Sequence, residues 1–115
     1  MIYTYYIKTK EVTKMTYEYA AKKIEELFNK ELEHIDRIRG LVEPDPDWSD
    51  RTSWIMLMTG AVDQFTAAAR TVIEIYIELS MGECEDWREL HKLEWECAER
   101  LKIEVEKNKE ELDKI

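Results

Sequence analysis

The chain has 115 residues, of which 44% are hydrophobic, enough for a folded domain with its own core and no need of metal or disulfide support. Its formal net charge of −9 argues against nonspecific binding to nucleic acids and against docking to anionic membranes, because both need a cationic face. Glycine and proline are scarce, at 3 and 2 residues, which favours long helices.

Cysteine usage and hydropathy both predict a cytoplasmic protein. If a helix begins near Asp86, Cys84 and Cys97 lie about 17–20 Å apart along its axis, beyond the reach of a disulfide. We therefore expect both thiols to be reduced, as in the cytosol. The first residues lack the pattern of a signal peptide. The longest uncharged run, residues 52–62, is about half of the roughly 20 residues that a bilayer requires.

Residues 1–13 are rich in tyrosine, isoleucine and threonine, which are favoured in strands. A lone strand is unstable without a partner, so three alternatives stay open. The segment could pair with a second copy, form extra helical turns, or remain a loosely held tail. We expect an ordered N-terminal extension over residues 1–14, followed by a helical bundle domain over residues 15–115.

The first helix is predicted over residues 15–39, with Thr13 or Thr16 as its N-cap. Gly40 is predicted as its C-cap, with Leu41 and Val42 folding back onto the last turn. Apolar residues recur at a spacing of three and four, as in an amphipathic helix. The predicted buried positions are Tyr17, Ala20 or Ala21, Ile24, Leu27 or Phe28, Leu32, Ile35 and Ile38.

The connection over residues 43–53 contains both prolines and several acidic residues, which together end the first helix. Asp47, Ser49 or Asp50 can cap the helix that follows. Trp48 lies in this connection. We interpret it as a plug for one end of the bundle, with an exposed binding anchor as the alternative.

The central helix, predicted over residues 50–80, is the element around which the chain is organised. Its segment 54–79 carries only four charges in a protein where charged residues make up 37% of the total. Apolar residues cover most of its circumference, so it must be covered on several sides. The expected buried positions are Trp54, Met58, Ala61, Phe65, Ala68, Val72, Ile75 or Tyr76, and Leu79.

The third helix is predicted from an N-cap at Asp86 to about Asp113, after Gly82 stops the central helix. Beyond Lys102 its apolar positions thin out, so this end is expected to project past the others or to pair with a second subunit. The predicted inner positions are Trp87, Leu90, Leu93 or Glu94, Cys97, Leu101, Val105, Asn108 and Leu112.

These elements predict an all-α fold, an antiparallel three-helix bundle with short connections. A central helix that is apolar on nearly every side needs further cover, and a second copy would supply it, giving a homodimer. The alternative is that the N-terminal segment folds over the gap. The candidate interface residues are Trp48, Trp54, Phe65, Arg70 and Glu74.

Arg70 is the unusual residue of the central helix, because a buried arginine needs a partner. It is expected to pair with Glu74, or with Asp63 of a second subunit, and so to fix the register of a dimer. The alternative is that Arg70 contacts an anionic ligand between the helices.

Candidate metal ligands are present but form no complete set. Glu31 and His34 have the Glu-x-x-His spacing by which di-iron bundles place two ligands on one face. The third helix offers His91 and Glu94 in the reverse order, and the central helix offers Asp63, Glu74 and Glu78. No nucleophile elbow or phosphate-binding loop is present. We therefore expect neither a metal nor another cofactor, and we interpret Cys97 as a core residue.

A second hypothesis of enzymatic function depends on the order of the predicted helices. The tryptophan-led apolar segment 54–65, followed by the acidic segment 86–101, resembles the all-α nucleotide pyrophosphohydrolases related to MazG. That resemblance implies magnesium held by a Glu-x-x-Glu motif and a later Glu-x-x-Asp motif. Here the corresponding stretch, residues 59–64, lacks the first carboxylate pair, and Glu89 is followed three residues later by Lys92.

The sequence thus leaves two classes of function. The first is a noncatalytic interaction module, a regulator or inhibitor of the kind that phages and mobile elements encode, acting as an acidic homodimer that binds a basic protein. The second is a metal-dependent pyrophosphohydrolase-like enzyme, or a relative that has lost its ligands.

Overall fold

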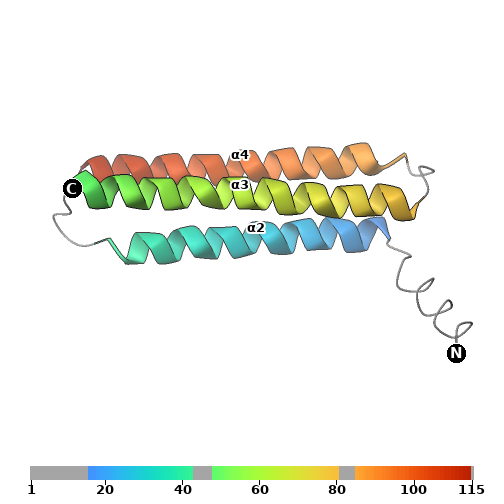
Figure 1. Ribbon diagram of the computed structural model, residues 1–115. Helices are drawn as coiled ribbons and strands as arrows, with labels where there is room; N and C mark the ends of the chain where they lie inside the picture. The colour runs from blue at the N-terminus through green and yellow to red at the C-terminus, as the bar shows by residue number, and fades with distance from the viewer. Residues whose placement is uncertain (1–15, 43–47, 81–84, 115) are drawn as a thin grey trace, which may run out of the picture.

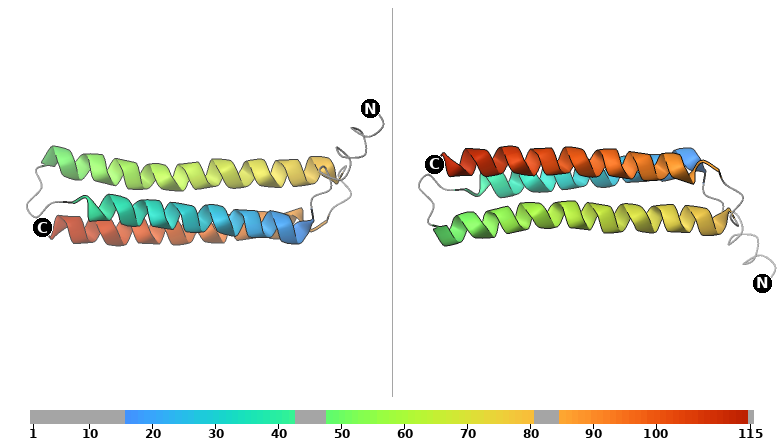
Figure 2. Two further views of the ribbon diagram at one scale, coloured as in Figure 1. Left: turned by 90° about the horizontal axis from the view of Figure 1, so that it is seen from below. Right: turned by 90° about the horizontal axis from the view of Figure 1, so that it is seen from above.

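The computed structural model describes residues 16–42, 48–80 and 85–114, apart from the side chains of Trp48 and Ser49. These residues form three helices, α2 (Tyr17–Gly40), α3 (Trp48–Leu79) and α4 (Trp87–Asp113), and no strand. The helices lie side by side along their lengths, and each packs against the other two (Figure 1, Figure 2). This part of the chain therefore confirms the prediction of an all-α bundle of long helices.

The direction of each helix can be followed in Figure 1, where residue numbers rise from right to left along α2 and α4 and from left to right along α3. Polar contacts between helices agree with this order. Arg70 and Tyr76 of α3 contact Glu94 of α4 and Asp86, the N-cap residue of α4, so residue numbers rise along one helix as they fall along the other. None of the described helices is long and apolar enough to cross a membrane.

Of the two N-caps predicted for the first helix, Thr16 is confirmed, whereas the predicted C-cap, Gly40, is wrong. Thr16 caps α2, and its hydroxyl accepts a 3.1 Å hydrogen bond from the amide of Tyr19. Gly40 is still helical, and Leu41 is the C-cap in ordinary right-handed backbone geometry. The Leu41 side chain is 69% exposed, so it does not fold back onto the last turn. The backbone does turn back there, with the amides of Leu41 and Val42 donating to carbonyls of the last turn.

The core runs along the whole bundle and joins the inner faces of all three helices. The Phe28 and Phe65 rings pack edge to face near its middle, with centroids 6.4 Å apart. After Phe65 the buried face of α3 lies one residue further along the chain than the spacing predicts. Ala69 and Ile73 are buried, whereas the predicted residues Ala68 and Val72 are only partly buried. The fully buried large side chains are Phe65, Ile24, Ile35, Met58, Ile73, Leu90, Leu101 and Leu112.

The end of α4 does not project past the bundle. Leu112 is fully buried, and Glu111 accepts a hydrogen bond from Arg39 Nε at 3.2 Å. The inner positions predicted for α4 from Leu90 onward are largely buried, including Asn108, whose amide nitrogen donates to the Glu104 carbonyl. The thin apolar pattern beyond Lys102 is therefore sufficient to pack against α2 and α3.

Several sequence predictions fall outside the described residues. These are the extension over residues 1–14, the two prolines, Gly82, Cys84 and the side chain of Trp48. The division into an extension and a bundle domain remains a prediction.

Candidate functional site

The side of α3 that faces away from the core carries a strip of six uncharged residues spaced three or four apart. This spacing places them along one face of the helix. The members of this α3 strip are Leu57, Gly60, Gln64, Ala67, Thr71 and Ile75. All are exposed except Gly60, which is partly exposed, and Leu57 and Ile75 are 53% and 39% exposed.

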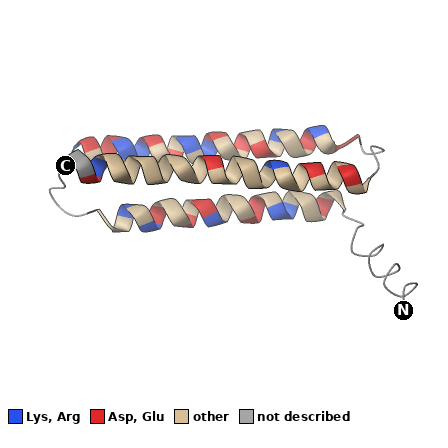
Figure 3. Ribbon diagram, in the orientation of Figure 1, with Lys and Arg blue, Asp and Glu red and all other residues tan. Residues whose placement is uncertain are grey.

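The α3 strip stands out against the rest of the surface. Figure 3 shows long uncharged stretches on α3, whereas α2 and α4 carry acidic and basic residues at close intervals. Met56, beside the strip, is a further large apolar residue, with 69% of its surface exposed. Contiguous exposed apolar surface is typical of a contact surface.

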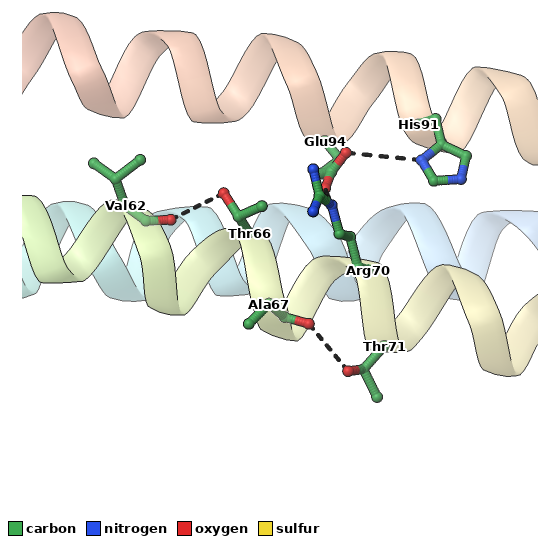
Figure 4. A network of polar contacts seen from close by, with 7 residues as sticks. All are labelled: Val62, Thr66, Ala67, Arg70, Thr71, His91 and Glu94. Carbon is green, nitrogen blue, oxygen red and sulfur yellow. Dashed lines mark hydrogen bonds and ion pairs between the residues drawn. The ribbon is translucent and has the colours of Figure 1, made fainter.

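Charged residues border the α3 strip on the side that faces α4. Asp63, Arg70 and Glu74 follow one another at intervals of seven and four residues, so they share one edge. Arg70 Nε donates a 3.0 Å hydrogen bond to Glu94 Oε1 on α4 (Figure 4). The expected intrahelical partner of Arg70, Glu74, is therefore replaced by Glu94.

The ion pair between Arg70 and Glu94 joins one exposed and one buried side chain. The Glu94 side chain is 8% exposed and that of Arg70 is 64% exposed. His91 Nδ1 lies 3.8 Å from the other carboxylate oxygen of Glu94. A guanidinium has five N–H donors, and the bond to Glu94 uses one of them. The pair thus fixes the position of Arg70 and leaves much of its guanidinium accessible at the edge of the strip.

The structure separates the five predicted interface residues. Phe65 is fully buried within the single chain, and Trp54 is partly buried against the same core. Arg70 and Glu74 are exposed on α3, and the side chain of Trp48 lies outside the description. Phe65 therefore serves the core of one chain, and the accessible face of α3 is the strip on its opposite side.

The candidate metal ligands do not converge. In the described parts of the chain, no three histidine, cysteine, aspartate or glutamate side chains are placed to hold a metal ion. Glu31 is buried, and its Oε2 makes no hydrogen bond to a described residue. Glu94 is engaged by Arg70 and His91 instead. The spacing Glu-x-x-His at Glu31 therefore assembles no site with these residues.

A shallow groove of about 400 Å³ lies between the first half of α2 and the first half of α4. It contains Glu89 and Lys92, where a lysine stands at the position of the aspartate in the Glu-x-x-Asp motif of the pyrophosphohydrolases. Its chemistry is three carboxylates, one ammonium group and one phenol, with no histidine or thiol. The lining residues are Tyr17, Ala21, Glu25, Glu89, Lys92, Leu93 and Glu96.

Cys97 behaves as a structural residue. Burial raises the pKa of its thiol, Arg100 lowers that pKa, and Glu25 and Glu96 raise it further. A raised pKa reduces the thiolate fraction and hence the reactivity of the sulfur. Cys97 packs in the core cluster, as the sequence predicted.

Comparisons of the chain with protein families, with curated proteins and with solved structures find no match. The resemblance to nucleotide pyrophosphohydrolases therefore gains no support from them.

Proposed function

We propose that the protein is a noncatalytic interaction module that works as a homodimer. The observation that carries this proposal is the α3 strip, in which six uncharged residues follow one another along the exposed face of the helix. Charged residues make up 37% of the whole protein. Leu57 and Ile75 place apolar surface near its two ends. Covering this surface releases water from apolar atoms at little desolvation cost, because no ionised group lies within the strip.

The acidic character of the remaining surface supports a regulatory role for such a dimer. Residues 1–39 carry a net charge of +1 and residues 40–115 one of −10, so the acidic surplus lies in the chain from residue 40 onward. An acidic surface attracts basic partners and speeds their association. We therefore propose a regulator or inhibitor whose partner is a basic protein.

The alternative, a metal-dependent enzyme, lacks a specific observation in its favour. The α2–α4 groove holds carboxylates beside Lys92, and the described residues include no group of three histidine, cysteine, aspartate or glutamate side chains placed to hold a metal ion. A lysine within such a group competes with a cation for the carboxylates.

Two measurements on the purified chain test the proposal. Sedimentation velocity over a wide concentration range should show a species of twice the 13.8 kDa chain mass. Titration with Mg²⁺ or Mn²⁺ should leave the melting temperature at its value in a matched ionic-strength control, because a ligand stabilises only the state that binds it. A monomer at all concentrations would contradict the dimer, and a metal-dependent rise in melting temperature would favour the enzyme.

A further inference from the structure

We infer that the homodimer forms when the α3 strip packs against the same strip of a second copy running in the opposite direction. The inference rests on the proposed function and adds the contact surface, the direction and the register. The two-fold axis then passes between Gln64 and Ala67 and lies perpendicular to both helices.

The order of residues along the strip is self-complementary about this axis. In the opposite direction, Leu57 of one copy lies level with Ile75 of the other, so apolar residues meet at both ends of the contact. Gly60 lies level with Thr71, and Gln64 with Ala67. Each of these pairs sets a larger side chain against a smaller one, which lets the two helices approach closely.

Charge complementarity at the edge of the strip supports the same register. Asp63 and Arg70 lie on the same edge, and their midpoint falls within one residue of the midpoint between Gln64 and Ala67. In an antiparallel helix pair each edge faces the same edge of its partner, as the e and g positions of antiparallel coiled coils do. Asp63 of each copy therefore meets Arg70 of the other, and the dimer gains two equivalent ion pairs.

A parallel dimer would lose these ion pairs. Its two-fold axis runs along the helices, so the edge with Asp63 and Arg70 faces the opposite, uncharged edge of the partner strip. Leu57 would meet Leu57, and Gln64 would meet Gln64. The opposite direction is the arrangement that satisfies both the apolar ends and the charged edge.

Arg70 is prepared for this contact before the dimer forms. Its bond to the buried Glu94 holds the guanidinium between α3 and α4, as Figure 4 shows. An arginine fixed by one carboxylate loses less side-chain entropy when it binds a second. Asp63 is exposed, and the described residues offer it no ion pair within the chain.

Cysteine cross-linking tests the direction. In a background with Cys84→Ser and Cys97→Ala, three variants are compared under mild oxidation: Leu57→Cys, Ile75→Cys and the double variant. The opposite direction predicts cross-linked dimers for the double variant and for a mixture of the two single variants, and none for either single variant alone. Positions 57 and 75 are about 27 Å apart along a helix. Cross-linking of Leu57→Cys alone would overturn the inference.

Charge reversal tests the edge contact without disturbing the pair between Arg70 and Glu94. Asp63→Lys places a cation opposite Arg70 of the partner and should raise the dimer dissociation constant about tenfold or more. Asp36→Lys is the matched control, because Asp36 is an exposed aspartate on α2 and the change in net charge is the same. Its dissociation constant should stay within about twofold of the unmodified chain.

The outcomes separate this inference from the proposed function. Suppose that the chain dimerises, but the double variant forms no cross-links and Asp63→Lys leaves the dissociation constant unchanged. The homodimer is then supported, and the α3 strip is excluded as its interface. A chain that stays monomeric rejects both. Equal effects of Asp63→Lys and Asp36→Lys would show that overall charge, and not the contact with Arg70, controls association.

Discussion

The hydroxyl of Tyr76 donates a 2.6 Å hydrogen bond to Oδ1 of Asp86 and so ties the end of α3 to the start of α4. Asp86 is the N-cap residue of α4, yet its side chain makes no capping hydrogen bond to the helix. Its backbone carbonyl accepts from the amides of Glu89 and Leu90 instead. The carboxylate is thus used to close the connection between two helices rather than to cap one of them.

The bond between Tyr76 and Asp86 should have a measurable effect on stability. Tyr76→Phe keeps the buried ring and removes the hydrogen-bond donor. It should lower the free energy of unfolding by about 1.5 kcal/mol, the low end of the usual range for a hydrogen bond to a charged group. Urea denaturation measures the change. Tyr19→Phe is the control, because Tyr19 is 56% exposed, and it should leave stability unchanged. Equal effects of the two substitutions would contradict the role assigned to this bond.

The pair between Arg70 and Glu94 should stabilise the single chain as well as the proposed dimer. Arg70→Met leaves Glu94 buried without its cation and should cost about 1–2 kcal/mol, after allowance for the exposure of Arg70. Lys102→Met, which breaks an exposed pair with Glu99, should cost less than about 0.5 kcal/mol. Both are measured by urea denaturation at a concentration low enough for monomers. A loss that appears only at concentrations where dimers form would assign Arg70 to the dimer alone.

Glu31 is a site where removing a charge should stabilise the protein. Its side chain is buried, and Oε2 finds no hydrogen-bond donor among the described residues. Glu31→Met fills the same space with an apolar chain and should raise the free energy of unfolding by about 1–2 kcal/mol. Glu33→Met on the exposed face of the same helix is the control and should change stability by less than about 0.5 kcal/mol. A destabilised Glu31→Met variant would show that the carboxylate has a partner or a function.

Helical periodicity predicts most of this fold because burial follows spacing on α2 and α4. It predicts Ile24 and Ile35 on α2 and Leu101 on α4, all of which are fully buried. It fails at Glu31, since a glutamate in a buried position leaves no apolar signal. On α3 it fails differently, because Ala68 and Ala69 are equally apolar and only the packing of the neighbouring helices selects between them.

The candidate site was harder to predict for the same reason. In a helix with apolar residues on most sides, hydropathy does not tell which side faces the core, so it does not distinguish a core position such as Phe65 from an interface position. The positions of α2 and α4 determine which side of α3 is buried, and the α3 strip lies on the side that they leave exposed. The pairing of Arg70 with Glu94 depends on two residues 24 positions apart, and only the packing of α3 against α4 brings them together.

The pKa of Cys97 gives a prediction about alkaline stability. Burial raises this pKa above its ordinary value of 9.0, so the folded chain holds the thiol proton more tightly than the unfolded chain does. The resulting stabilisation is fully present below the unfolded pKa and is lost as the pH rises through the folded pKa. The unmodified chain should therefore lose more stability than Cys97→Ala between pH 8 and pH 10, as measured by urea denaturation at each pH.

Alkylation of the same thiol provides an independent check. In a Cys84→Ser background at pH 8, iodoacetamide should modify Cys97 at least about tenfold more slowly in the folded chain than in urea, because both burial and the raised pKa limit the thiolate. Raising the pH should increase the rate in the folded chain over a higher range than in the unfolded chain. A folded chain that reacts as fast as the unfolded one would place Cys97 at the surface and contradict its position in the core.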